Sequence, residues 1–285
     1  MVMSRMIAVL LLAIPACSEP IKPASAPPPE PVSPARPVNP AEFKYAFRYR
    51  DLQESASLSG EWFFRDGRAY RFVQGADEVL VLDSKPKMVR FLDLRRKVTA
   101  ELPFAIVEKS IEQYRADLRE GIEASEAENT RGGRVEAAMD RDLLDPRFKV
   151  ESVSEGSGFR LTNPTVEVDA TGEPDTIEGR IGRIGEAFAI GVKLQALRFP
   201  EALPPFAQLD SLDILIASKK LRPVSLSYLF RLTGPPEKYE WTYTLTSALT
   251  ERDWEALKRI DATFLTARSI RFDRYERLID RGDRP

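Results

Sequence analysis

The side chains that most often carry out catalysis are scarce in this chain of 285 residues. It has no histidine, which excludes Ser-His-Asp and Cys-His catalytic sites, an imidazole general base and a histidine metal ligand. Its one cysteine excludes an internal disulfide and a thiolate cluster for zinc or iron–sulfur. We therefore predict that the protein uses no metal and no other cofactor.

Carboxylates are abundant, but none are paired at a spacing that marks an acid–base dyad. Asp93 stands between two leucines of an expected strand, and we expect its side chain to point outward. Ser-Lys catalysis needs companion motifs that are missing from the sequence. We predict a protein that is not an enzyme. A hydrolase or transferase with two acids facing one cleft stays open as an alternative.

The charge balance bears on the class of partner. Lysine and arginine number 42 against 44 aspartate and glutamate, so the formal net charge is −2 and no positive field would gather nucleic acid. With 43% hydrophobic and 30% charged residues the chain is typical of a globular protein.

The single cysteine, Cys17, follows a segment with the composition of an export signal. One arginine precedes an entirely apolar run at residues 6–14, and the small Ala16 lies just before Cys17. This run is much shorter than the roughly 20 apolar residues of a spanning helix. Residues 14–17, Ile-Pro-Ala-Cys, resemble a bacterial lipobox, whose cysteine is diacylated and becomes the new N-terminus. We predict a lipoprotein signal peptide at residues 1–16 and lipidation of Cys17, with an ordinary secreted protein as the alternative.

A proline-rich segment, residues 17–40, follows the signal. It has nine prolines between Pro20 and Pro40, cannot build a core and favours an extended polyproline II conformation. At about 3.1 Å per residue it would reach on the order of 70 Å. We interpret it as a tether, rather than as a Pro-x-x-Pro docking motif. In lipoproteins of this kind the next residues direct sorting, and Ser18 and Glu19 favour the outer membrane. We expect a lipid-anchored protein of the cell envelope that faces the periplasm.

Residues 41–285 are expected to form one α+β domain. Six short alternating segments between residues 43 and 102 predict an antiparallel meander, in which Asp66-Gly67 marks a tight hairpin. Six strands in sixty residues exclude a doubly wound parallel sheet. Further strands are expected within residues 148–170 and 223–245, and an edge strand or short tail at 266–278.

Helices are predicted around these strands. Apolar residues recur at steps of three and four along residues 104–122, which indicates an amphipathic helix. We expect this helix to cover the concave face of a curved sheet, with Val107, Ile111 and Tyr114 as a lid. Residues 175–198 form a glycine-rich helix in this interpretation. Thr250 begins a final helix with a capping box that ends at Asp253.

Aromatic residues are concentrated on the expected strands. On a curved sheet, an inner face of this kind either packs against helices or leaves room for a ligand. We predict that the apolar concave face is the ligand-binding surface, with the alternative that these residues only fill the core. The predicted face consists of Phe47, Tyr49, Trp62, Phe64, Tyr70, Phe72, Phe91, Tyr228, Phe230 and Trp241, with Tyr243 beside them.

Several short sequence segments resemble those of a known family. Residues 62–68 read Trp-Phe-Phe-Arg-Asp-Gly-Arg, residues 89–97 read Val-Arg-Phe-Leu-Asp-Leu-Arg-Arg-Lys, and Leu-Pro-Pro-Phe at 203–206 precedes Tyr-Glu-Trp at 239–241. With the lipobox, they look like the LolA/LolB superfold of outer-membrane lipoprotein carriers and receptors. The resemblance covers most of residues 41–265. It implies a curved antiparallel half-barrel, plugged by helices, whose concave face takes acyl chains.

The chain departs from that family because it begins directly in a strand, with no N-terminal helix, and no family residue is assigned a role here. Two functions follow as expectations. The first is an outer-membrane-anchored lipoprotein that binds a lipid or a lipoprotein acyl chain. The second is a non-catalytic module of the same fold that senses envelope stress or binds a partner protein of the envelope.

Overall fold

The computed structural model of the protein describes residues 39–53, 57–154, 157–199, 205–246 and 248–280. The predicted signal peptide, Cys17 and the tether up to residue 38 lie outside the described residues.

The first half of the domain is the predicted meander. Its strands are β1 (Phe43–Asp51), β2 (Ser57–Arg65), β3 (Arg68–Val73), β4 (Glu78–Asp83), β5 (Met88–Asp93) and β6 (Val98–Pro103). Asp66 and Gly67 both have positive φ, 52° and 79°, as a two-residue hairpin turn with the right-handed twist of a sheet requires. The prediction of a tight hairpin at this position is confirmed.

The second half completes one open sheet. It contributes β7 (Lys149–Ser154), β8 (Gly158–Thr162), β9 (Val166–Pro174), β10 (Leu221–Phe230), β11 (Glu237–Thr246) and the short β12 (Arg268–Ser269). Among the described residues the order of the twelve strands is β12-β6-β5-β4-β3-β2-β1-β11-β10-β9-β8-β7. All neighbours are antiparallel except β12 and β6, so the sheet is mixed. The α+β class is confirmed, and β1 joins the two halves by pairing with β11.

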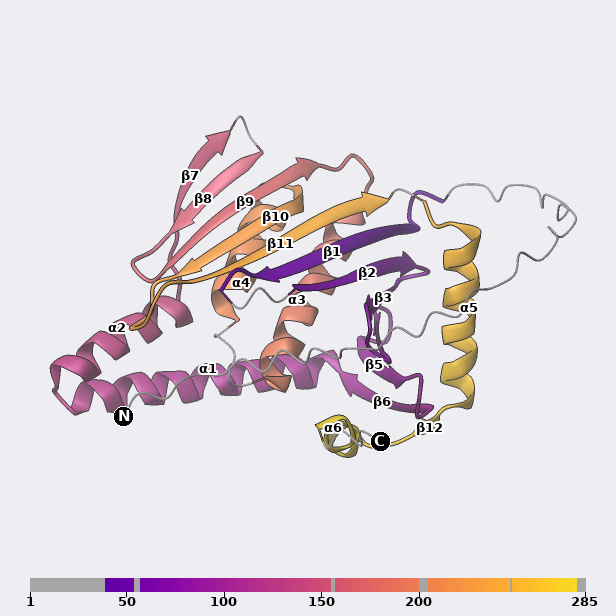
Figure 1. Ribbon diagram of the computed structural model, residues 1–285, viewed down its shortest axis with the longest axis horizontal. Coiled ribbons are helices and arrows are strands. Elements are labelled where there is room, and N and C mark those ends of the chain that lie inside the picture. Colours follow the sequence, from indigo (N-terminus) through magenta and orange to yellow (C-terminus); the bar gives the residue numbers. More distant parts are fainter. Residues whose placement is uncertain (1–38, 54–56, 155–156, 200–204, 247, 281–285) are drawn as a thin grey trace, which may run out of the picture.

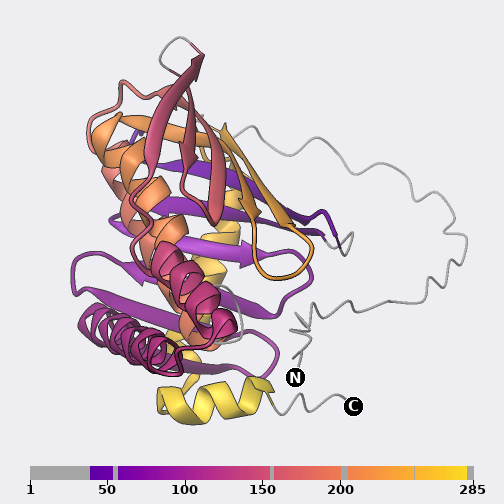
Figure 2. The same cartoon turned by 90° about the vertical axis from the view of Figure 1, so that its left-hand side faces the viewer.

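Helices cover both faces of this sheet (Figures 1 and 2). Their bounds are α1 (Phe104–Ala127), α2 (Arg131–Leu144), α3 (Arg180–Arg198), α4 (Phe206–Asp213), the π-helical turn η1 (Ile214–Ser218), α5 (Glu251–Thr266) and α6 (Phe272–Asp280). We call the face that packs against α3 and α4 the inner face, since Phe188 and Leu212 join its apolar core. The face that packs against Leu257 and Ile260 of α5 is the outer face.

The long helix α1 has a different place from the one expected. Its first turn enters the main core through Val107, but the rest of its apolar stripe packs against other helices. Ile111 lies in a cluster with Ala137 and Phe206, and the ring centroid of Tyr114 is 6.3 Å from that of Phe206. In Figure 1, α1 runs from β6 toward α2 along the border of the sheet. The amphipathic pattern is therefore explained by helix–helix packing.

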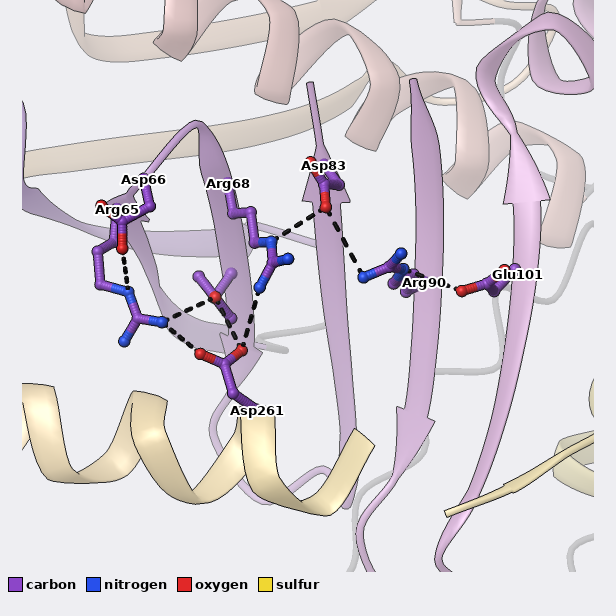
Figure 3. A network of polar contacts seen from close by, with 8 residues as sticks. Arg65, Asp66, Arg68, Asp83, Arg90, Glu101 and Asp261 are labelled. Carbon is purple, nitrogen blue, oxygen red and sulfur yellow. Dashed lines mark hydrogen bonds and ion pairs between the residues drawn. The ribbon is translucent and has the colours of Figure 1, made fainter. Parts of the chain in front are cut away.

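The helix α5 is held on the outer face by charged side chains (Figure 3). Asp261 accepts hydrogen bonds from Arg65 and from the Tyr70 hydroxyl, the latter at 3.0 Å, and lies 3.6 Å from Arg68. The chain of charges continues across β4, β5 and β6, through Asp83, Arg90 and Glu101. Because each of these charges has an opposite neighbour, we interpret the network as a structural clamp.

The C-terminal region contains the expected edge strand, β12, but it is short and an unexpected helix follows it. After the two residues of β12 the chain forms α6, whose Phe272 and Tyr275 pack against Phe91 with ring centroids 5.0 and 5.6 Å apart. In the part of the chain that the structure describes, every helix is too short or too polar to cross a membrane.

Candidate functional site

The inner face gathers most of the predicted aromatic residues. Eight of the ten lie in or against the core below α3 and α4: Phe47, Tyr49, Trp62, Phe64, Phe91, Tyr228, Phe230 and Trp241. Tyr243 joins them. Tyr70 and Phe72 lie instead on the outer face, where they pack with Phe63 and residues of α5. The predicted aromatic surface is thus divided between two faces of the sheet.

The hairpin turn explains why Tyr70 and Phe72 lie apart from the others. With Arg65 opposite Arg68, the register places Trp62 opposite Arg71 and Phe63 opposite Tyr70. Residues directly opposite each other in a sheet share a face, so Arg71 points inward with Trp62. Both aromatic residues of β3, Tyr70 and Phe72, were predicted to point inward, which is wrong, and the inward position of Arg71 was not predicted. The Asp66-Gly67 turn was the signal in the sequence that could have predicted the inward orientation of Arg71, because the turn sets the register of the hairpin.

A small cavity lies between the inner face and the two helices α3 and α4. Its volume is about 50 Å³. The walls come from five neighbouring strands, β10, β11, β1, β2 and β3, and from both helices. The lining residues are Phe47, Trp62, Arg71, Phe188, Gly191, Val192, Gln195, Gln208, Leu212, Leu226, Tyr228, Trp241 and Tyr243.

Aromatic rings make up much of the cavity wall. The ring centroid of Phe188 is 6.0 Å from that of Trp62 and 5.0 Å from that of Tyr243, while Phe47 and Trp241 are 6.1 Å apart. Rings at these distances attract one another beyond their simple burial. The cavity holds only a few water molecules, at roughly 10–15 Å³ each. Pockets for organic ligands commonly measure roughly 300–1,000 Å³.

Four of the predicted site residues, Phe47, Trp62, Tyr228 and Trp241, line this cavity. The other inner-face aromatics pack around it. Phe64 stacks on Phe43, Tyr49 contacts Trp241, Phe91 packs against α6, and Phe230 contacts Tyr239.

The cover of the cavity comes from α3 and α4, while Val107, Ile111 and Tyr114 of α1 are not among its lining residues. Close approach of α3 to the sheet depends on a glycine. A Cβ atom at Gly191 would lie 3.4 Å from the Trp62 ring, so the helix backbone rests almost directly on the indole. The periodicity of apolar residues predicted both α1 and α3, but it gave no information about which of these two helices covers the sheet.

Arg71 is the one charged residue among the described residues that line the cavity. Its guanidinium carbon lies 5.3 Å from the Phe47 ring centroid and 5.8 Å from that of Trp62, which are cation–π distances. Its side chain makes no hydrogen bond or ion pair with any residue that the structure describes. Its side chain is half-buried, and burial lowers the pKa of Arg71 from its usual value, although arginine remains charged.

The nearby acid, Glu78, is already engaged. Its carboxylate accepts hydrogen bonds from Arg198 at 2.6 and 3.2 Å and from the Tyr275 hydroxyl at 2.9 Å. It still raises the pKa of Arg71 through its charge, but only in part opposes the effect of burial. The guanidinium of Arg71 therefore faces the cavity without a carboxylate of its own.

The described lining of the cavity offers aromatic and aliphatic surfaces, two amides, two tyrosine hydroxyls and one cation. The described lining residues include no carboxylate, and burial raises the pKa of the Tyr228 and Tyr243 hydroxyls, which stay protonated near neutral pH. Asp93, expected to point outward, is buried and only 1% exposed, and it binds the backbone amide and guanidinium of Arg96. No cluster of three or more potential metal ligands occurs within the described ranges.

No protein-family model matches the chain, and no curated protein matches it.

Proposed function

We propose that the protein is an outer-membrane-anchored lipoprotein whose domain is a curved half-barrel, plugged by α3 and α4, that binds a lipid or an acyl chain on its inner face. One observation carries the proposal. The inner face has an aromatic-lined cavity between the sheet and two helices, at a place where the sheet and its covering layer meet.

The chemistry of the cavity wall supports an apolar ligand. Phenylalanine, tryptophan and leucine side chains from four strands and two helices converge on it, and its polar groups are few. Apolar walls with a small number of placed polar groups are typical of sites for small amphiphilic molecules.

Binding of an acyl chain requires a larger cavity than the one in the structure. About 50 Å³ is too little for an acyl chain, so α3 and α4 must move away from the sheet when one binds. Gly191 leaves this interface with no side chain at the contact with Trp62, and the π-helical turn η1 follows α4 directly. Turns of π-helix are often found at functional sites.

The same small volume favours a second candidate function. A filled half-barrel would act as a non-catalytic module that binds a partner protein of the envelope. It predicts a specific crosslinked protein and no co-purifying lipid.

Native mass spectrometry tests the first proposal. The full chain with Cys17→Ser, which cannot be acylated at that position, is isolated from the envelope without detergent. A bound mass that dissociates as a lipid is expected. Gly191→Leu, which places a side chain against Trp62, should lose that mass, while Gly182→Leu on the open side of α3 should keep it. Clean apo masses, with a protein captured by crosslinking, would instead support the partner-binding module.

A further inference from the structure

Arg71 is out of place in a site built for a purely apolar chain. An apolar inner face would be served by a leucine or valine at this position of β3, opposite Trp62. A half-buried guanidinium loses hydration that only an opposite charge and hydrogen-bond acceptors can replace. The contacts with Phe47 and Trp62 stabilise its charge through the ring faces but supply no acceptor for its N–H groups.

The remaining polar groups of the cavity are suited to the same task. Gln195 of α3 and Gln208 of α4 border the cavity, one from each covering helix, and their amides can donate hydrogen bonds. Glu78 is occupied by Arg198 and Tyr275, so it does not supply the missing anion. The arrangement is a single cation with neutral donors beside it, surrounded by aromatic rings.

We propose that Arg71 binds the oxyanion head group of an acidic amphiphile, such as the carboxylate of a fatty acid or the phosphate of an acidic lipid, while the apolar tail lies among the aromatic residues of the inner face. This inference rests on the proposed lipid-binding function and narrows its ligand. A guanidinium donates paired, charge-assisted hydrogen bonds to a carboxylate or a phosphate. A neutral ester carries no negative charge with which the guanidinium could pair.

The test compares an acid with its neutral ester. Dansyl-undecanoic acid and its methyl ester are titrated into the full chain carrying Cys17→Ser, and binding is followed by dansyl fluorescence. We expect the wild-type cavity to prefer the acid by on the order of tenfold or more. Arg71→Gln should weaken binding of the acid by a similar factor and leave the ester unchanged, and Arg71→Lys should keep part of the preference.

Arg48→Gln is the matched control. Arg48 is an exposed arginine on the adjacent part of the sheet, one residue from Phe47 and outside the cavity lining, and its replacement should leave both affinities unchanged. Displacement by decanoate or by decyl phosphate then identifies which oxyanion is preferred, and either result supports the proposal.

Two outcomes would overturn the inference in different ways. Equal affinities for acid and ester, or an acid preference that survives Arg71→Gln, would refute the role of Arg71 and leave lipid binding intact. Binding of neither compound to the wild-type chain would refute the proposed function as well. If Arg71→Gln does not fold, Arg71→Lys decides the question: a smaller acid preference than that of the wild type supports the role of Arg71, and an unchanged preference refutes it.

Discussion

Arg71 and Trp62 face each other across the β2–β3 pair, and the guanidinium carbon of Arg71 lies 5.8 Å from the Trp62 ring centroid on the inner face of the sheet. The pair places a cation in an otherwise apolar wall. Its energetic consequence differs from that of the paired arginines elsewhere in the domain, and this difference can be measured.

Replacement of Arg71 by methionine should stabilise the protein. The methionine side chain has similar length, fills the same space and removes a half-buried charge that has no carboxylate partner. We expect the free energy of unfolding to rise by about 1 kcal/mol, measured by urea denaturation. The same substitution at Arg65, which is 7% exposed and bound to Asp261, should lower it by about 2 kcal/mol or more. A large loss at both positions would mean that Arg71 has a structural role.

Substitution by alanine should have opposite effects on stability at two glycines, Gly60 on the inner face of the sheet and Gly191 on the helix α3 that covers it. At Gly191 a Cβ atom meets the Trp62 ring at an ordinary contact distance, so Gly191→Ala should gain up to about 1 kcal/mol from helix propensity. At Gly60 a Cβ atom would lie 2.2 Å from the Phe72 carbonyl oxygen and 2.5 Å from the Phe47 ring, so Gly60→Ala should destabilise. Thermal unfolding measures both. Stabilisation by Gly60→Ala would show that Phe47 does not hold its place in the cavity wall.

The capping box of α5 should make stability depend on pH at the acid end. Asp253 is largely buried, which by itself raises its pKa, but hydrogen bonds from Thr250 and the charge of Lys44 outweigh burial and lower the pKa below its usual 3.8. A carboxyl with a lowered folded-state pKa stabilises fully above 3.8 and loses this contribution as the pH falls through the lower value.

We therefore expect Asp253→Ala to cost about 1 kcal/mol at neutral pH. The difference from wild type should shrink in urea titrations carried out at progressively lower pH. A difference that stays constant down to the acid transition would show that the charge of Asp253 does not contribute.

The clamp of α5 in Figure 3 predicts a contrast between two acids of the same helix. Asp261 accepts hydrogen bonds from Arg65 and Tyr70 of the sheet, so Asp261→Ala leaves a buried cation with less compensation. The expected loss of unfolding free energy is about 1–3 kcal/mol. Glu255 forms an exposed ion pair with Lys258, which water screens, so Glu255→Ala should leave the free energy of unfolding nearly unchanged. Equal effects would argue against the clamp.

The N-terminal signal predicts membrane attachment through Cys17. In the proposed function acyl chains on Cys17 are the anchor, so Cys17→Ser should release the protein from the membrane fraction into the soluble envelope fraction. Fractionation with metabolic labelling by a fatty acid measures both effects. A wild-type chain that takes up no label would favour an ordinary secreted protein.

Much of the fold was readable from the sequence because its signals are local. The alternation of Phe43, Tyr45 and Phe47 predicted β1, and Asp66-Gly67 predicted the β2–β3 hairpin. Thr250 and Asp253 form the capping box at the start of α5 as expected. Each depends on residues only a few positions apart, so no knowledge of distant contacts was needed.

The faces of β3 were harder to assign because both are buried. Tyr70 and Phe72 pack under α5 and Arg71 points into the inner face, so both aromatic residues of this strand lie on the side away from the cavity. Hydrophobicity alone favours the opposite orientation. Only the register of the hairpin, counted from its two-residue turn, assigns each residue to its face.

By itself, the sequence determined the α+β class, the meander and most helices, since composition and short-range periodicity encode them. The export signal at residues 1–16 stays a prediction. The tertiary structure decided which helix covers which face. Both α1 and α3 are amphipathic helices. The apolar side of α1 packs mainly against other helices, while α3 contacts Trp62 at Gly191. It also decided that Arg71 faces a cavity without a carboxylate, because the surroundings of a side chain are formed by residues far apart in the chain.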